Sequence, residues 1–476
     1  MKDSTRNGAN DAFDILVLGA GSAGFSAAIT AAEGGARVAL IGHGLIGGTC
    51  VNIGCVPSKA LIRAMEAVHS GPAARRFSGI SVTSRIDDWT AVQAQKAQLV
   101  SGLRNKKYEA LLPEYDGLTY IEAAGPAKLV EGGVAFDGRT IRAPKTIITT
   151  GSSAAMPPIP GIESIEKLDS TSALELQDLP ESLLVIGGGV IGCELGQMFA
   201  RAGVKVTICC RTQLLPDAGP EISDALKASF EAEGLTICSG ISYQSIEQTA
   251  AGIQLHCQSE TERRLITAER VLVATGRSPN TADLDAGAVG VKLDARGGII
   301  VDGQMRTSNP SIYAAGDVTG RDQFVYMAAY GAKLAANHAA GRPVDAYDNS
   351  AMPWVVFSDP QVAGVGLTAA AARDAGYDVM ESIAPLNQLP RALAAADTRG
   401  LIKLIADRKT DKLLGAQLMA PEGADTIQTM VMALKFGMTT KQLGAMIFPY
   451  LTTVEGLKLA AQGFNKDIAK LSCCAG

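Results

Sequence analysis

Two pairs of cysteines are the residues of this chain whose types and spacing could do chemistry. Cys50 and Cys55 stand with four residues between them, shortly after a glycine-rich segment. Cys473 and Cys474 are adjacent to each other near the C-terminus. Thiolates are the reactive form in disulfide exchange and are good ligands for soft metals. The two pairs together suit the transfer of a thiol-seeking substrate from the surface to a buried redox centre.

The adjacent pair is poorly suited to forming a disulfide within itself. Consecutive Cα atoms are about 3.8 Å apart, which is shorter than the usual span of a disulfide. We therefore expect Cys473 and Cys474 to remain a dithiol. The alternative is a tail with incidental thiols, although exposed thiols are a liability unless they are used.

A cofactor loop is predicted between two apolar runs near the N-terminus. Residues 13–18 indicate a buried parallel strand, which leads into a G-x-G-x-x-G pattern, an Ala-rich helix to about residue 35 and a strand at 36–41. This order is typical of a βαβ dinucleotide-binding unit. Glycines permit the tight turn and let backbone N–H groups approach a pyrophosphate. The expected binding residues are Gly19, Gly21, Ser22, Ala23 and Gly24.

The same pattern returns in the middle of the chain. A strand at 183–186 is followed by Gly187, Gly189 and Gly192, then by a helix and a strand at 204–209. One such pattern is a weak signal, but two copies in the same context are a strong one. Two dinucleotide folds in one chain indicate two dinucleotides, most simply FAD and a nicotinamide cofactor.

The rest of the chain completes an α/β fold with two Rossmann-like dinucleotide-binding domains and a C-terminal α+β domain. The FAD-binding domain is predicted at 1–150 and 278–345, the NAD(P)H-binding domain at 151–277, and the C-terminal domain at 346–476. Predicted strands that end in glycine turns are 146–151, 271–277 and 311–317. Predicted C-terminal elements are strands at 354–357, 400–405 and 413–418 and helices at 424–436 and 441–446.

Composition limits the function further. The formal net charge of −5 gives no reason to expect nucleic acid or an anionic membrane as a partner. No long uncharged apolar run predicts a membrane span, and residues 1–12 lack the apolar segment of a secretory signal. Nine cysteines with one C-x4-C pair point to redox chemistry in a reducing compartment. We therefore expect a cytoplasmic protein without stable membrane association.

The segment from Gly48 to Lys59 carries a family resemblance. Its pattern C-V-N-x-G-C-V-P-S-K, the two glycine loops and the pair Gly316 and Asp317 resemble the pyridine nucleotide–disulfide oxidoreductases. The resemblance covers nearly the whole chain and implies a homodimer, with the C-terminal domain as its dimerisation domain. Within the family, the chain is similar to the mercuric reductases in residues 323–326, 353–363, 448–460, 464–467 and 471–476.

The resemblance implies roles for the residues around the flavin. Cys55 should be the thiolate nearest the flavin, and Cys50 should be the thiol that exchanges ligands. Lys59 should lie near flavin N5, with Glu194 as its ion partner. Further cofactor contacts are expected from Gly48, Thr49, Thr150, Gly151, Asp317, Arg211 and Gly276.

The substrate implied by the resemblance is Hg(II), which is soft and favours two thiolate ligands. It would arrive as a thiolate complex, bind Cys473 and Cys474 of one subunit, and pass to Cys50 and Cys55 of the other. Electrons from NADPH would pass through FAD to the metal, and volatile Hg(0) would leave because it does not hold thiolates. Tyr108 and Tyr450 match tyrosines that flank the metal.

The histidine content favours a metal over a disulfide as the substrate. Disulfide reductases of this family use a His near the C-terminus as an acid–base group, but none of the four histidines lies after His338. Tyr450 stands two residues after Phe448, and Glu455 follows. A tyrosine with a pKa near 10 is a poor base at neutral pH but can donate a hydrogen bond or contact a metal. The histidines show no metal-ligand spacing, so we predict no metal-binding histidine.

Three features depart from the family pattern. Gly42 stands where a carboxylate usually holds the adenosine ribose, so we expect FAD binding with a weaker ribose contact. Arg211 favours the 2′-phosphate of NADPH, although Asp217 stands where a second Arg is often found. Many mercuric reductases carry an N-terminal metal-binding domain, and residues 1–12 are too short for one.

The remaining cysteines are interpreted by default as buried small hydrophobes. Cys209 and Cys210 are adjacent at a strand end, where side chains point to opposite faces, so we do not expect them to chelate together. The other members of this group are Cys193, Cys238 and Cys257.

Three other functions stay open at this stage. A thioredoxin reductase-like enzyme can also end in a redox-active cysteine pair, and a dihydrolipoamide dehydrogenase shares the fold. Both need the C-terminal His that this chain lacks. A protein that only sequesters metals with its thiols would not need two dinucleotide folds.

Overall fold

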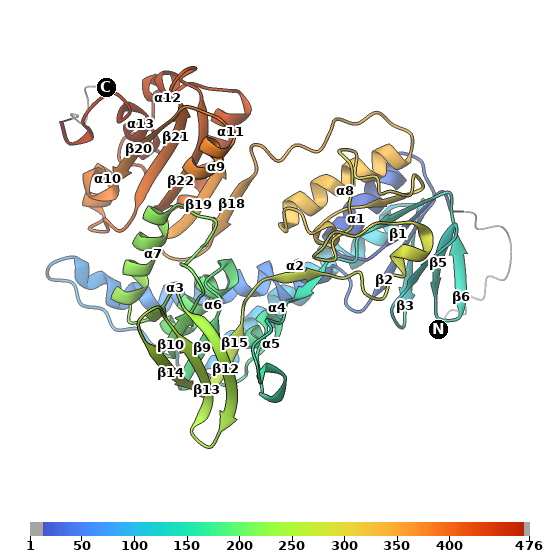
Figure 1. Ribbon diagram of the computed structural model, residues 1–476, viewed down its shortest axis with the longest axis horizontal. Helices are drawn as coiled ribbons and strands as arrows, with labels where there is room; N and C mark the ends of the chain where they lie inside the picture. The colour runs from blue at the N-terminus through green and yellow to red at the C-terminus, as the bar shows by residue number, and fades with distance from the viewer. Residues whose placement is uncertain (1–12, 471–476) are drawn as a thin grey trace. The chain divides into compact units, whose positions relative to one another are not determined.

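The computed structural model describes residues 13–470, which form two compact units (Figure 1). The first unit takes the chain up to Pro57, together with Ala94–Ala155 and Arg277–Tyr347. The second unit takes Ser58–Gln93, Met156–Gly276 and the chain from Asp348 onward. The three domain boundaries given above remain predictions.

A five-stranded parallel sheet forms the core of the first unit, in the order β17-β7-β1-β2-β3. The strands are β1 (Ile15–Leu18), β2 (Val38–His43), β3 (Leu118–Ala123), β7 (Lys145–Ile148) and β17 (Ile312–Ala314). All four side chains of the central β1 are buried. A parallel strand covered on both faces is a continuous apolar run, which is why the sequence predicts β1 correctly.

Two Ala-rich helices, α1 (Ser22–Glu33) and α8 (Val325–Ala339), pack against each other in the first unit. Ala28, Ala31 and Ala332 are fully buried between the elements of this core. Small side chains let the helix axes approach closely. This packing fixes the N-terminus of α1 directly after the first glycine loop.

Smaller antiparallel pieces complete the first unit. Strands β4 (Lys128–Val130), β5 (Gly133–Phe136) and β6 (Arg139–Arg142) form one sheet. Strands β8 (Ser152–Ala154) and β16 (Arg277–Pro279) form a two-stranded ladder.

The second unit contains a four-stranded parallel sheet in the order β11-β10-β9-β15. Its strands are β9 (Ser182–Ile186), β10 (Lys205–Cys209), β11 (Thr236–Cys238) and β15 (Arg270–Val273). Helix α6 (Val190–Arg201) follows the second glycine loop, and α7 (Pro220–Ala232) leads to β11. An antiparallel sheet of β12 (Ser242–Thr249), β13 (Gly252–Gln258) and β14 (Arg263–Ala268) also belongs to this unit. This βαβ arrangement confirms the second predicted dinucleotide fold.

The C-terminal part of the second unit is an antiparallel sheet in the order β18-β19-β22-β21-β20. Its strands are β18 (Pro353–Val356), β19 (Gln361–Gly366), β20 (Val379–Pro385), β21 (Leu401–Asp407) and β22 (Leu413–Ala420). The helices include α11 (Gly423–Lys435), α12 (Thr440–Ala445) and α13 (Glu455–Gln462). The sequence predicts β18, β21, β22, α11 and α12, but it misses β19, β20 and α13.

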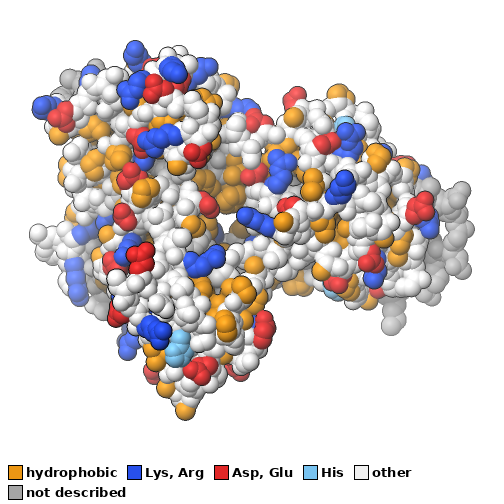
Figure 2. All heavy atoms as spheres, viewed as in Figure 1, with side chains coloured by type: hydrophobic (Ala, Val, Ile, Leu, Met, Phe, Trp, Pro, Cys, Tyr) orange, Lys and Arg blue, Asp and Glu red, His pale blue; other side chains and the backbone are white. Residues whose placement is uncertain are grey.

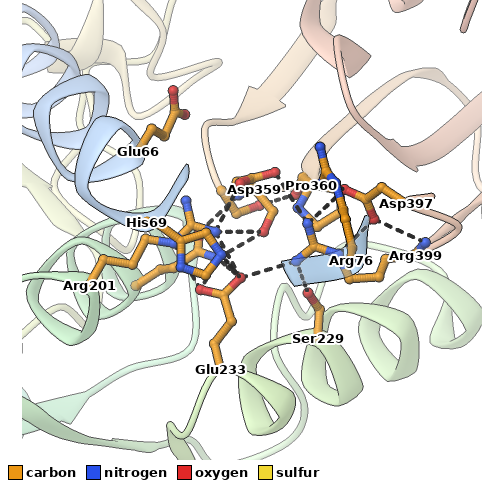
Figure 3. A network of polar contacts seen from close by, with 12 residues as sticks. Glu66, His69, Arg76, Arg201, Ser229, Glu233, Asp359, Pro360, Asp397 and Arg399 are labelled. Carbon is orange, nitrogen blue, oxygen red and sulfur yellow. Dashed lines mark hydrogen bonds and ion pairs between the residues drawn. The ribbon is translucent and has the colours of Figure 1, made fainter. Parts of the chain in front are cut away.

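A network of buried charges joins three segments within the second unit (Figure 3). Arg201, at the end of α6, has a side chain only 4 % exposed and lies 2.7 Å from Glu233 and 2.9 Å from Asp359. Arg399 adds a contact of 3.1 Å to Glu233. His69 of helix α3 (Cys55–Ala73) faces the same Glu233, and burial, with the charge of Arg201, lowers its pKa. The network therefore ties α3 to the nucleotide-binding sheet and to the C-terminal sheet.

The surface mixes charges of both signs. On the face drawn in Figure 2, Lys and Arg side chains alternate with Asp and Glu side chains across the described residues. Among the helices of the described chain, none is both long and apolar enough to cross a membrane.

Candidate active site

The first glycine loop is shaped by backbone contacts that leave no room for side chains. Gly19 has φ +117°, a conformation that favours glycine. A Cβ on Gly24 would overlap the carbonyl oxygen of Gly19, so the helix can start this close to β1 only because residue 24 is glycine. The Thr149 hydroxyl donates hydrogen bonds to the carbonyls of Leu18 and Gly19, at 3.0 and 2.9 Å. The N-terminus of α1 is therefore accessible to an anion such as a pyrophosphate.

The second glycine loop repeats this geometry. Gly187 has φ +118°, and a Cβ on Gly192 would overlap the carbonyl oxygen of Gly187. The N–H of Gly187 donates to the carbonyl of Cys209 at 2.8 Å, which links the loop to the end of β10. Gly189 caps α6 with extended backbone. Both loops thus present a helix N-terminus without side chains in front of it.

The two cysteines of the C-x4-C pair belong to the first unit. Cys50 is half-buried within α2 (Gly48–Ile53), and Cys55 is exposed at the first residue of α3. Among residues 13–470, neither cysteine is joined to another in a disulfide bond. The N-terminus of a helix favours negative charge, so the position of Cys55 suits a thiolate.

The turn before α2 is fixed by glycine and by a buried amide. Gly48 has φ +64°, and a Cβ there would lie 2.6 Å from the Cα of Gly21. The Asn52 side-chain N–H groups donate to the carbonyls of Ile46 and Gly48, both at 2.9 Å. Arg104 donates to the Asn52 side-chain oxygen at 3.2 Å. The cysteine segment is therefore anchored against the first glycine loop.

Tyr108 belongs to the same unit as both cysteines, and its ring would lie 3.1 Å from a Cβ on Gly47, just before α2. Burial raises its pKa, and the charges of Cys50 and Cys55 raise it further, against a hydrogen bond with Ser22. The hydroxyl of Tyr108 is 3.3 Å from the Ser22 hydroxyl, and its ring meets the Phe25 ring edge-on at 4.9 Å. A raised pKa keeps this phenol protonated at neutral pH, so that it can donate a hydrogen bond to a thiolate or contact a metal.

A second phenol, Tyr326, was not among the predicted site residues. It belongs to α8 and stacks on Phe324, with ring centroids 5.4 Å apart. Burial raises its pKa, with further contributions from Asp322 and Cys55. The signal was present in the sequence, because Tyr326 closes one of the stretches that carry the family resemblance.

Lys59 and Glu194 form a close ion pair in the second unit. Lys59 Nζ lies 2.6 Å from Glu194 Oε2, and the Glu194 side chain is only 4 % exposed. The other carboxylate oxygen of Glu194 accepts the backbone N–H of Phe357 at 3.0 Å. The Lys59 ammonium also lies over the Phe357 ring, 4.8 Å from its centroid. Glu194 therefore fixes the direction of the Lys59 ammonium group.

Asp317 sits in a hydrogen-bonded cluster of the first unit. Ser152 donates to its carboxylate at 2.6 Å, and Arg277 donates to the Ser152 hydroxyl at 2.7 Å. Arg277 is also 3.8 Å from the carboxylate itself. Thr150 closes the neighbouring turn by donating to the carbonyl of Asn280 at 2.8 Å. Arg277 was not among the predicted site residues, because its hydrogen bonds join segments that are distant in the chain.

The structure also explains what surrounds Gly42. A Cβ there would meet Ala20 at 2.7 Å and the ring and hydroxyl of Tyr120 at 2.8 Å. Tyr120 thus fills the space that a side chain at position 42 would need. Glu122 of β3 is the direct register partner of Gly42.

The remaining predicted residues are not brought into one place by the described structure. Arg211 is exposed and lies two residues after β10. Burial raises the pKa of Tyr243, and the charge of Arg211 acts against that rise. Tyr450 is 53 % exposed in the loop before α13, where the N–H of Leu451 donates to Glu455 at 3.2 Å. Cys473 and Cys474 lie outside the described residues. Within the described chain, no three His, Cys, Asp or Glu side chains are grouped to hold a metal ion.

The fold and these loops define a family. Residues 13–336 match the pyridine nucleotide-disulphide oxidoreductase model, and residues 352–461 match the dimerisation domain of the same family. The chain belongs to this family. The match confirms two dinucleotide-binding folds followed by a dimerisation domain and supports a homodimer.

Particular relatives are similar along nearly the whole chain. A mercuric reductase of Staphylococcus aureus is 43% identical over 466 residues, covering 98% of this chain and 84% of the relative. One of Streptomyces lividans is 42% identical over 475 residues, covering 98% of this chain and 99% of the relative. Among solved structures, the HOCl-induced flavoprotein disulfide reductase RclA from Escherichia coli has a TM-score of 0.83 and 31% identity, covering 94% of this chain and 99% of that one.

Family and relatives together make the chain an oxidoreductase that uses FAD and NADPH. The first loop fits FAD, because Gly19 and Gly24 let backbone approach a pyrophosphate and Asp317 offers a fixed carboxylate. The second loop fits the nicotinamide cofactor, because Gly187 and Gly192 reproduce the same close approach.

Proposed function

We propose that this enzyme reduces Hg(II) to volatile Hg(0) with NADPH, moving the metal between two pairs of thiols. The observation that carries the proposal is the phenol of Tyr108, whose pKa is raised by burial and by the charges of Cys50 and Cys55. A protonated phenol cannot accept a proton from a thiol, but it can stabilise a thiolate or contact a thiolate-bound metal. The mercuric reductases that match 98% of the chain support the same substrate.

Capture of the substrate is assigned to Cys473 and Cys474. A thiolate complex of Hg(II) exchanges one ligand at a time, so each incoming thiol gives its proton to the thiolate that it displaces. Two adjacent thiols can complete both exchanges on the same metal ion. The same exchange then transfers the metal to Cys50 and Cys55 of the other subunit.

The residues around the cysteine pair have separate tasks in the second exchange. Cys55, at the N-terminus of α3, is placed to be the thiolate that stays charged. Cys50, half-buried in α2, is placed to meet the incoming metal. Tyr108 is anchored by Ser22 and Phe25, and we assign its hydroxyl to contact the thiolates or the metal that they bind.

Reduction needs a cofactor that the chain holds at its first loop. The chemistry supplied by FAD, when it is bound, is the transfer of two electrons that NADPH delivers as hydride. Lys59 would face the flavin ring, with its ammonium directed by Glu194. Because Glu194 is buried and also accepts the Phe357 N–H, the ammonium has a fixed position near developing negative charge.

The nucleotide preference is assigned to Arg211. Arg211 follows β10 in the chain. In this fold, the adenosine ribose binds at the end of that strand. Arg pairs with a 2′-phosphate through two parallel hydrogen bonds, which favours NADPH over NADH. Asp217 lies six residues further and weakens that preference.

The test compares electron acceptors with purified enzyme and NADPH. HgCl2 with excess small thiol, glutathione disulfide and lipoamide are each supplied under the same conditions. Rapid NADPH oxidation only with mercury supports the proposal, whereas turnover of either disulfide without mercury would move the enzyme to the disulfide reductases. The latter is the alternative that the likeness to RclA favours.

A further inference from the structure

Two thiols outside the active site face each other across neighbouring strands. Cys209 is the last residue of β10, and Cys238 is the last residue of β11. The strands are parallel, and the two cysteines are direct register partners. Register partners on adjacent strands project to the same face of a sheet. The carboxyl edge of the nucleotide-binding sheet therefore carries a thiol pair.

The pair lies in a cluster of buried apolar side chains. Cys209 is fully buried and Cys238 is 5 % exposed, in the same apolar cluster as Cys257. The Tyr243 hydroxyl donates to the carbonyl of Cys209 at 2.9 Å. The N–H of Cys210 donates to the carbonyl of Cys238 at 2.9 Å. These contacts fix the backbone at both cysteines.

One charged and exposed side chain acts on the pair. The pKa of the Cys238 thiol is lowered, first by Cys209 and then by Arg264, an exposed residue of β14. Cys210 points away from the pair, toward the second loop, where its sulfur would lie 3.2 Å from a Cβ on Gly188. Displacement of the flexible Arg264 side chain would open Cys238 to an incoming ligand.

The spacing of the strands allows a metal to bridge the two thiols. Neighbouring strands lie about 4.8 Å apart. A metal–sulfur bond of about 2.3 Å makes a linear sulfur–metal–sulfur unit roughly 4.6 Å long. Both cysteines are free of disulfide bonds in the structure.

The number of available ligands selects the kind of metal. Among residues 13–470, no group of three or more His, Cys, Asp or Glu side chains could hold a metal ion, so a four-coordinate zinc site is not available here. Two thiolates suffice for a soft cation with a closed d shell, which accepts linear coordination. We propose that Cys209 and Cys238 bind one soft two-coordinate cation, Hg(II) or Cu(I), at a site separate from the active-site thiols.

Binding at this site is a ligand exchange without electron transfer. Each cysteine loses its proton and forms one metal–sulfur bond. When the metal arrives as a complex with two small thiolates, both metal–sulfur bonds of that complex break. The two displaced thiolates take up the two protons and leave as thiols.

Occupation of the site by a metal ion would weaken the binding of NADPH. Arg211 follows Cys209 by two residues, and Gly187 of the second loop is hydrogen-bonded to the Cys209 carbonyl. A cation that draws Cys209 toward Cys238 would shift both of these groups. We expect a higher KM for NADPH when the site is filled, so that excess metal slows the enzyme.

The direct test uses the full-length FAD-loaded chain with Cys50, Cys55, Cys473 and Cys474 changed to Ser. This parent variant is dialysed against HgCl2 with excess free cysteine, and in a second arm against Cu(I) under anaerobic conditions. Bound metal is counted by mass spectrometry. The parent should retain about one equivalent of at least one of the two ions, since soft thiolate sites select them.

Matched cysteine variants locate the bound ion. Cys238→Ser in the parent should reduce retention to less than about a tenth, because one thiolate cannot hold the ion against excess free thiol. Cys193→Ser and Cys257→Ser, which remove other buried thiols, should retain the metal. FAD content confirms that each variant folds. Retention that survives Cys238→Ser would overturn the proposal, as would no retention of either ion by the parent.

X-ray absorption on the loaded parent requires no further substitution. Two sulfur ligands at about 2.3 Å are expected from the linear geometry. Three or more ligands, nitrogen or oxygen ligands, or a disulfide in place of the metal would each contradict the proposed site. The parent lacks the active-site thiols, so the result does not depend on the function proposed above.

Discussion

At the scale of single residues, the site differs from that of a thiol–disulfide enzyme in what stands beside its cysteines. An imidazole moves a proton at neutral pH, whereas Tyr108 is a phenol whose pKa is raised by burial and by the charges of Cys50 and Cys55. Tyr326 adds a second phenol with a raised pKa, to which Cys55 contributes. Two protonated phenols suit the stabilisation of thiolates and thiolate-bound metal.

Removal of the Tyr108 hydroxyl tests its role. We predict that Tyr108→Phe lowers kcat for Hg(II) reduction about tenfold, the worth of one hydrogen bond to a charged group. FAD content should not change, because the Phe25 contact remains. Tyr115→Phe, at another partly buried tyrosine of the same core, is the control and should keep full activity. Equal rates for both variants would return Tyr108 to a packing role.

Gly42 gives a prediction that opposes the family pattern. Family members hold the ribose with an acid here, yet in this chain a Cβ at position 42 would press on Ala20 and Tyr120. Gly42→Ala should therefore destabilise the FAD-binding unit by about 2 kcal/mol through overpacking, with loss of bound flavin. Gly125→Ala, where a Cβ meets nothing within 4 Å, is the matched control. Thermal unfolding and flavin content measure the effect, and an unaffected Gly42→Ala protein would show that Tyr120 yields easily.

At the scale of elements, α3 carries Cys55 and Lys59 at its start and joins the charge network near its end. His69 faces Glu233, which Arg201 and Arg399 share. Taking these charges out of water is costly, so the network is stable only while every member is paired. The orientation of α3 within the second unit thus depends on residues far from the cysteine pair.

Breaking the network should be much more damaging than breaking a surface pair. Arg201→Ala leaves Glu233 and Asp359 without their most buried partner, and we predict a loss of about 3 kcal/mol in unfolding free energy. Arg85→Ala, whose ion pair with Asp87 is exposed on both sides, should cost less than about 0.5 kcal/mol. Urea unfolding compares the two, and similar losses would contradict the buried network as the support of α3.

The sequence predicts the elements whose residues are dictated locally. Gly19, Gly24, Gly187 and Gly192 are required by backbone contacts within each loop, and β1 is buried on both faces. These features leave a clear pattern within a short stretch of sequence. The FAD and nicotinamide loops were therefore predictable from the chain alone.

Features set by distant contacts were not predictable in the same way. Strand β19 lies between β18, which precedes it in the chain, and the more distant β22. Arg277 acquires its role from Ser152 and Asp317, and the space at Gly42 is set by Tyr120. The register of Cys209 with Cys238 is a further case, since neither residue indicates the other in sequence.

At the scale of the whole molecule, the account requires active sites shared between subunits. The dimerisation-domain match supports the homodimer, and the tail cysteines are proposed to serve the partner's site. A heterodimer of Cys50→Ala/Cys55→Ala with Cys473→Ala/Cys474→Ala chains then has one complete site, because the intact inner pair meets the intact tail.

Mixed dimers therefore distinguish shared from separate sites. Each parent homodimer should be inactive on mercury bound to two small thiols. A statistical mixture should recover about a quarter of the wild-type rate, since half of the dimers are mixed and half of their sites are complete. Steady-state NADPH oxidation measures this recovery. A mixture as inactive as its parents would show that each tail serves its own subunit.

The most direct measurement follows NADPH oxidation while Hg(0) is trapped from the gas above the solution. The enzyme is supplied with HgCl2 and excess small thiol, and Cys55→Ala serves as the inactive control. The account predicts one Hg(0) for each NADPH oxidised by the wild type, and none from the variant, although NADPH still reduces its flavin. Mercury-dependent NADPH loss without Hg(0), or Hg(0) formation that survives Cys55→Ala, would contradict the assignment of Hg(II) reduction to this thiol pair.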